Sequence, residues 1–194
     1  MKNPLLTFLV LSATMQSGAQ TSKKDYMVVP ILSQQSFYLK RDVSKNNKGS
    51  HLVLQVNLPA NTVEWFYTIT TKPSHGEFSN NDLTGQLVKL VDPELGISRN
   101  GSISVPAGTG TCDVYLMTSL LELHKYVNKR AAVSFLTNDS REHFASGAVS
   151  VKDFLDGSCF LIVRNPGSAR GVNVNIEVTA VVLSSPVGSS TAMQ

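Results

Sequence analysis

The chain has 194 residues, of which 42% are hydrophobic and 16% are charged. This length suffices for one domain with a hydrophobic core. The formal net charge is +3, and Lys and Arg occur in runs no longer than a pair, which argues against a nucleic-acid-binding surface. The charged fraction is below the ~25% of ordinary soluble domains, and Ser, Thr and Asn replace the missing charges. This composition is typical of a β-rich surface.

The first residues have the pattern of a secretory signal peptide. Lys2 is a short basic region, the segment 5–13 is apolar, and the small residues Ser17 and Ala19 stand at a cleavage site. We therefore expect residues 1–19 to be removed and the mature chain, from Gln20, to be secreted or periplasmic. A membrane anchor is the alternative, but the apolar run is about half the ~20 residues that a span needs.

The next four segments are predicted to be β-strands. The third alternates apolar and polar residues, and the fourth is rich in aromatic and β-branched residues. Pro30, inside the first of them, indicates an edge strand or a bulge. The third and fourth are separated only by a short Ala-Asn-Thr turn, so we expect them to pair as a hairpin. The four predicted strands are 27–32, 36–41, 51–59 and 63–71.

Two short helices are predicted in the middle of the chain. The first has Leu83, Leu87 and Leu90 at helical spacing after Asp82, a candidate N-cap. The second, within residues 119–128, begins with a capping box of Ser and Glu. Strands are predicted between the helices at 101–108 and 111–118, and after them at 145–154, 157–165 and 172–183.

The last predicted strand alternates almost without interruption. Its apolar residues form one face, and its polar residues, including Asn175 and Glu177, are expected to face water. About eight such strands must cover their apolar faces against one another. The predicted fold is all-β: an antiparallel two-sheet β-sandwich, jelly-roll-like, with two short helices. We expect a single domain over residues 20–183 and a flexible tail over 184–194.

The two cysteines, Cys112 and Cys159, lie on predicted strands. If Asp113 and Arg164 face water, parity places both thiols on the buried faces. An even number of cysteines in a secreted protein favours a structural disulfide between them. Two inert core thiols, or a reactive or metal-binding pair, are the alternatives.

Part of the chain resembles the GOLD-type and PPC-type β-sandwich modules. Asp113, Val114 and Tyr115 match a strand that precedes a short helical excursion, and the segment 157–165, with Phe160 near an aromatic position, matches a Gly-led strand. The resemblance covers roughly residues 112–183 and, more loosely, 51–71. It implies a non-catalytic module that meets other proteins, glycans or an envelope surface, and it assigns no functional residue.

Catalytic signals are absent from the sequence itself. There is no Gly-x-Ser-x-Gly elbow and no His-Glu-x-x-His motif. We therefore expect no catalytic residue, metal or cofactor. The candidate binding surface contains Phe66, an aromatic residue on the expected outer face of its strand, and His75 in a Pro-Ser-His-Gly turn. Burial of Phe66 under a helix, and a plain connecting role for the His75 loop, are the alternatives.

These observations predict an exported, non-catalytic binding or interaction module with a protein or glycan partner. A carbohydrate-binding module and a secreted hydrolase acting on envelope polymers are the alternatives. A carbohydrate module would need a shallow aromatic platform, whereas a hydrolase would need a histidine or acid in a cleft.

Overall fold

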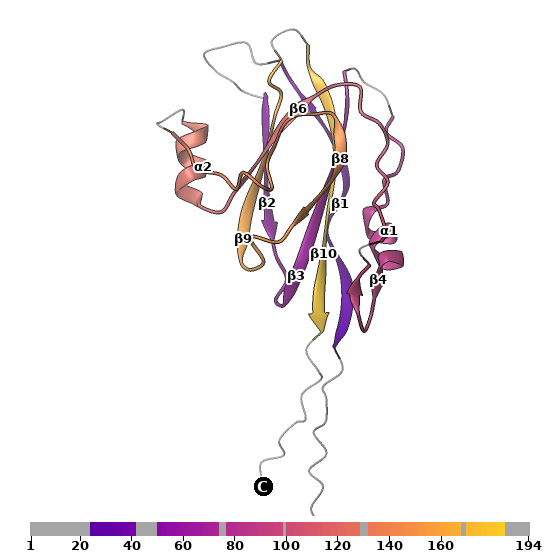
Figure 1. Cartoon of the computed structure of the whole chain (residues 1–194). Helices are drawn as coiled ribbons and strands as arrows, with labels where there is room; N and C mark the ends of the chain where they lie inside the picture. The colour runs from indigo at the N-terminus through magenta and orange to yellow at the C-terminus, as the bar shows by residue number, and fades with distance from the viewer. Residues whose placement is uncertain are drawn as a thin grey trace, which may run out of the picture.

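The computed structural model describes residues 24–41, 50–73, 77–98, 100–128, 132–167 and 170–184. They form a sandwich of two antiparallel four-stranded sheets (Figure 1), which confirms the predicted fold. Sheet A has the strand order β1 (Asp25–Leu39), β10 (Val172–Ser184), β3 (Thr62–Lys72) and β8 (Ser146–Val151). Sheet B has the order β2 (His51–Asn57), β9 (Ser158–Arg164), β6 (Cys112–Met117) and β7 (Arg141–Phe144).

The core lies between the two sheets, where the alternating apolar residues of both meet. The polar atoms of its two large aromatic residues also have hydrogen-bond partners. Trp65 Nε1 donates to the Phe154 carbonyl at 2.8 Å, and the Tyr67 hydroxyl donates to the Asp139 carbonyl at 2.6 Å. The parity predicted for β6, β9 and β10 is confirmed, because their inward residues belong to the cluster between the two sheets.

The predicted hairpin of β2 and β3 is wrong. β2 pairs with β9 in sheet B, and β3 pairs with β10 and β8 in sheet A. The turn between them, where Asn61 has a φ of 61°, carries the chain from one sheet to the other. Both strands have an apolar face, and these faces pack across the sandwich. Alternation identifies such a face but does not distinguish packing across sheets from pairing within one.

Two other strand predictions need correction. The two strands expected at 27–32 and 36–41 form one long edge strand, β1, whose register with β10 shifts near Pro30 and again before Gln35. The strand expected at 101–108 is a connector without strand pairing. In addition, β4 (Val91–Asp92) and β5 (Gly96–Ile97) form a small hairpin directly after the first helix.

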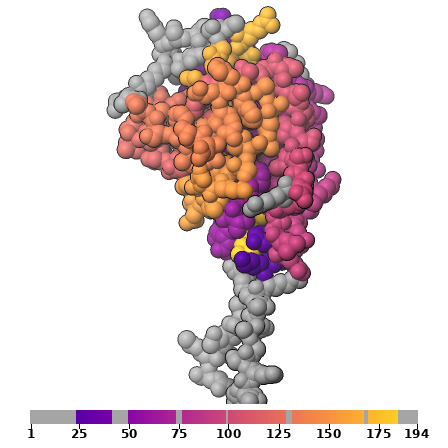
Figure 2. Space-filling view, in the orientation of Figure 1, coloured from indigo at the N-terminus to yellow at the C-terminus, as the bar shows by residue number. Residues whose placement is uncertain are grey.

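Both predicted helices are present. α1 (Leu83–Leu90) lies against the outer side of sheet A and α2 (Leu120–Val127) lies on the side of sheet B (Figure 1). The segment from α1 through the connector 100–110 covers one flank of the molecule in Figure 2. No helix of the described residues is long and apolar enough to cross a membrane. The predicted signal peptide, residues 1–19, and the tail beyond Ser184 lie outside the described residues.

The predicted disulfide between Cys112 and Cys159 is wrong, and both thiols are free. Both side chains do point into the core and are fully buried. However, β6 and β9 are antiparallel neighbours, with Asp113 opposite Arg164 and Met117 opposite Phe160. The cysteines therefore lie at opposite ends of the pair, roughly 20 Å apart at ~3.3 Å per residue. A disulfide needs Cα atoms within about 7 Å.

Candidate binding pocket on the outer face of sheet A

The outer face of sheet A is polar but buried. Asn175, Glu177 and Thr179 of β10 are at most 5% exposed. The prediction that these residues face water is wrong, because α1 packs over this row and Ser36 of β1 lies beside Asn175. Buried polar groups need hydrogen-bond partners, and the partners of Glu177 and Thr179 show how the covering layer is attached.

Glu177 fastens α1 to the sheet. Its carboxylate accepts hydrogen bonds from the backbone N–H groups of Leu83, at 2.9 Å, and of Thr84, at 3.2 Å. These are two of the donors that the first turn of a helix leaves without partners. The hydroxyls of Thr84 and Thr179 lie 2.9 Å apart. Asp82, the predicted N-cap, accepts from the Gly85 N–H at 3.1 Å. Side chains of β10 thus hold the first turn of α1 in place.

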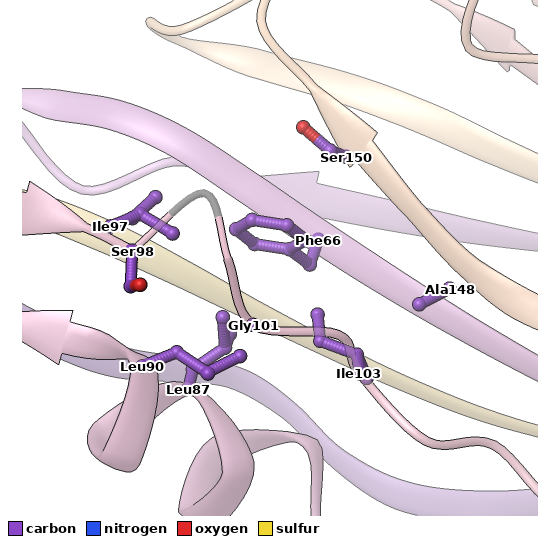
Figure 3. Close-up of a pocket in the computed structure, with 9 residues that line it drawn as sticks. All are labelled: Phe66, Leu87, Leu90, Ile97, Ser98, Gly101, Ile103, Ala148 and Ser150. Atoms are coloured by element: carbon purple, nitrogen blue, oxygen red, sulfur yellow. The ribbon is translucent and has the colours of Figure 1, made fainter.

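A partly open pocket of about 260 Å³ lies between this layer and the sheet (Figure 3). Phe66 of β3 lies at its centre, facing residues from α1, β5, the connector and β8. The lining is mainly apolar, with two serine residues. Its residues are Phe66, Leu87, Leu90, Ile97, Ser98, Gly101, Ile103, Ala148 and Ser150.

Small residues keep the pocket open. Ala148 and Ser150 provide the β8 wall, and Gly101 lies so close to α1 that an added Cβ would stand 2.1 Å from Leu90 Cδ2. Ser150 donates to the Glu64 carboxylate, which also lies 3.4 Å from Lys152 Nζ. Charged groups therefore stand beside the β8 rim, while the interior offers apolar surface. This arrangement can accept an uncharged apolar group.

The structure changes the interpretation of Phe66. Its strand pattern predicts an exposed position, but the side chain is only 6% exposed, as in the alternative in which a helix covers it. It nevertheless lines a pocket that opens to solvent. His75, the other candidate, lies outside the described residues. The partners of Phe66 come from distant segments, and no local sequence signal marks them.

A second pocket, of about 190 Å³, lies under α2 on the outer face of sheet B. The Tyr115 and Phe135 rings are 4.9 Å apart, and the Arg164 guanidinium lies 5.7 Å from the Tyr115 ring centre. Arg164 also pairs with Asp113 at 2.6 Å. Asp113 was expected to face water, yet it is 2% exposed, because the segment that follows α2 covers this face too. Desolvation raises the pKa of Tyr115.

The linings of the two pockets are mainly apolar and aromatic. Neither lining contains a carboxylate, a histidine or a thiol. Burial raises the pKa of Asp139, but its side chain belongs to neither pocket. Among the described residues, no group of three or more His, Cys, Asp or Glu side chains could hold a metal ion. An apolar ligand group would find contacts in either pocket, whereas an acid–base pair would have to come from elsewhere.

No protein family model and no curated protein matches the chain. Similarity to known proteins therefore assigns no ligand and no activity to either pocket. What the structure establishes at the level of fold is the two-sheet sandwich.

Proposed function

We propose that this protein is an exported, non-catalytic binding module of the cell envelope or the extracellular space. In this proposal its ligand is a protein, which inserts one apolar side chain into the Phe66 pocket. The resemblance to GOLD-type and PPC-type sandwiches supports a module that works through contacts rather than chemistry. Loops and covering segments on a rigid sandwich are common places for such contacts.

The observation that carries the proposal is the size and lining of the pocket. A volume of about 260 Å³ is below the ~300–1,000 Å³ of typical small-molecule sites. It suits a single aliphatic or aromatic side chain, and such anchors seated in pockets dominate protein–protein binding energies. The apolar walls contributed by Leu87, Ile97 and Ile103 match that ligand group.

The geometry favours a protein over the two alternatives. A sugar-binding platform presents an open aromatic face, whereas Phe66 is 6% exposed and is surrounded by the other residues of a partly open pocket. A hydrolase needs an acid, a histidine or an activated nucleophile beside the bound substrate. The lining contains no histidine, and the carboxylate that Ser150 contacts, that of Glu64, is paired with Lys152.

Site-specific photo-crosslinking tests the proposal. Ser98 is exposed at the pocket rim, and Ser158, at the start of β9 in the other sheet, provides a matched exposed serine. Variants that carry a photo-reactive residue at one of these two positions are incubated with envelope and culture-supernatant fractions of the source organism and then irradiated. We expect one protein to be captured reproducibly from position 98 and not from position 158.

A pocket-filling variant makes the test specific. Ala148→Leu places a branched side chain in the pocket and should abolish capture from position 98. Ser158→Leu, which adds the same side chain on sheet B, should leave it unchanged. Capture that survives Ala148→Leu, or a blank accompanied by saturable binding of envelope glycans, would contradict the proposal. The glycan result would move the carbohydrate-binding alternative to first place.

A further inference from the structure

The sandwich has four edge strands, and three of them are poor templates for pairing with another chain. β1 contains Pro30 and two register shifts. β7 has four residues and a register shift of its own. β8 is crossed by the connector, where Gly108 N–H donates to the Ser146 hydroxyl at 3.0 Å, and is followed by Lys152. Prolines, bulges, short length and lysines are the devices by which proteins protect sheet edges.

β2 lacks all of these devices. It has seven residues that pair with β9 in one unbroken register, from His51 opposite Arg164 to Asn57 opposite Ser158. Its sequence, HLVLQVN, contains no proline, no Lys or Arg, and no acidic residue. A regular, uncharged edge of this length is a template for strand addition.

The hydrogen bonds at the two ends of β2 show which of its residues direct their backbone N–H and C=O groups toward β9. Asn165 N–H donates to the Ser50 carbonyl, and Leu58 N–H donates to the Gly157 carbonyl, both at 2.9 Å. In an antiparallel pair the hydrogen-bonded residues alternate, so the even-numbered residues of β2 bond to β9. The odd-numbered residues direct their N–H and C=O groups outward, and the described part of the chain offers them no backbone partner. They are His51, Val53, Gln55 and Asn57.

The inner face of the same edge is incompletely covered. Leu52 and Leu54 contact the core but are only partly buried. Their partners across the register in β9, Val163 and Leu161, are fully buried. One more strand beside β2 would pair the outward backbone groups of its odd-numbered residues and cover these two leucines at the same time.

We infer that the added strand is β2 of a second copy of this chain, paired antiparallel across a two-fold axis. In the register that uses the whole strand, Leu54 lies opposite Leu54 of the partner subunit. The outward backbone groups of Val53 then bond to Gln55 of the partner subunit, and those of His51 to Asn57 of the partner subunit. The two copies of sheet B become one continuous sheet.

The composition of β2 makes a second copy the fitting occupant. A two-fold interface brings a surface against itself, so it must complement itself. Here the inner face is apolar and neither face carries Asp, Glu, Lys or Arg, so none of these charges opposes its own copy. A charged strand from another protein would find no opposite charge on β2. This inference is independent of the proposed function, because β2 belongs to sheet B and the Phe66 pocket to sheet A.

Sedimentation equilibrium of the purified protein tests the inference. We expect a concentration-dependent dimer that Val53→Pro converts to a monomer, since proline removes an outward N–H that β9 does not use. Val53→Ala, which keeps that N–H, should still dimerise. Thermal unfolding of the proline variant confirms that it remains folded. A monomer at all concentrations, or a dimer that persists in Val53→Pro, would overturn the inference.

A cysteine variant tests the register without depending on the proline. Leu54→Cys should form an intermolecular disulfide under mild oxidation, because residues directly opposite in a non-hydrogen-bonded pair have their Cβ atoms close together. Gln55→Cys, one residue away, should not. The native Cys112 and Cys159 are fully buried and do not compete. Equal crosslinking of both variants, or none of Leu54→Cys, would exclude this register.

Discussion

The two helices in the described part of the chain have eight residues each, yet they are attached in different ways. α1 buries Leu83 and Leu87 completely against sheet A. α2 buries only Leu123, at 8% exposure, and leaves Leu120 and Leu121 more than half exposed. Helices this short are unstable alone in water, so the difference lies in what the sandwich supplies to each.

Sheet A supplies α1 with a side chain that accepts hydrogen bonds from its first turn. Glu177 of β10 satisfies the first turn of α1 across more than 90 residues of sequence. α2 depends more on its own neighbourhood: Ser119 accepts from the Leu121 N–H, and Glu122 pairs with Lys125 and accepts from the Ser134 N–H. α1 is therefore an extension of the core, whereas α2 is a surface element with a locally determined position.

Truncating the buried leucine of each helix should show this difference most strongly. Leu87→Ala removes a fully buried side chain and should lower the free energy of unfolding by about 3 kcal/mol. Leu123→Ala, at the more exposed site, should lower it by about 2 kcal/mol. Urea unfolding of both variants measures the difference. Equal losses would show that α2 is anchored as firmly as α1.

The anchor itself can be tested by Glu177→Gln. The amide keeps one oxygen acceptor but loses the charge and the second acceptor, so we expect a loss of about 2 kcal/mol. Glu64→Gln provides the control on the same outer face of sheet A. Its carboxylate pairs with Lys152 near the surface, and we expect a loss below about 1 kcal/mol. Urea unfolding that finds the control equally damaging would argue against a special role for Glu177.

Strand parity could be predicted from the sequence because it is a local property. The inward orientation of Val114, Leu161 and Val174 follows from alternation alone. The existence of both helices follows from two other local signals, apolar residues at helical spacing and N-cap residues. Register and strand partners are not local. The predicted disulfide failed for that reason: Cys112 and Cys159 face inward as expected, but the antiparallel register places them at opposite ends of the pair.

The candidate pocket shows the same limit. Sequence reasoning placed Phe66 on the outer face of its strand, and that is where the structure has it. It could not show that Leu87, Gly101 and Ala148, from three other segments, close around the ring. The covering of an outer face depends on where α1 and the connector pack, and Asn175 and Glu177 have the same alternating pattern whether that face is wet or dry.

The two cysteine thiols lie in the core between the two sheets, and their ionisation makes the stability of the protein depend on pH. Burial raises the pKa of Cys112 and of Cys159 from the ordinary 9.0 to about 12. The unfolded chain therefore loses its thiol protons first as the pH rises. This contribution to stability is complete below pH 9 and is lost between pH 9 and about pH 12, with about 1 kcal/mol lost per thiol at pH 10.

Urea unfolding at pH 8 and pH 10 measures this loss. The native protein should lose more stability between the two pH values than Cys159→Ser, which has one thiol fewer to ionise. Native thiols should also react slowly with an alkylating reagent at pH 8, because the thiolate is the reactive form. An identical pH dependence in the two proteins would show that the Cys159 thiol does not contribute.

The smallest effect is expected on the exposed side of α2. Leu121 is 64% exposed, so Leu121→Gln should change the free energy of unfolding by no more than about 0.5 kcal/mol. Urea unfolding measures this change, and Leu123→Ala, two residues away on the buried side of the same helix, is the internal control. A loss as large as that of Leu123→Ala would mean that the outer side of α2 is covered in solution. Because α2 lies on sheet B, the same sheet as the proposed β2 interface, the dimer state of each variant should be measured alongside its stability.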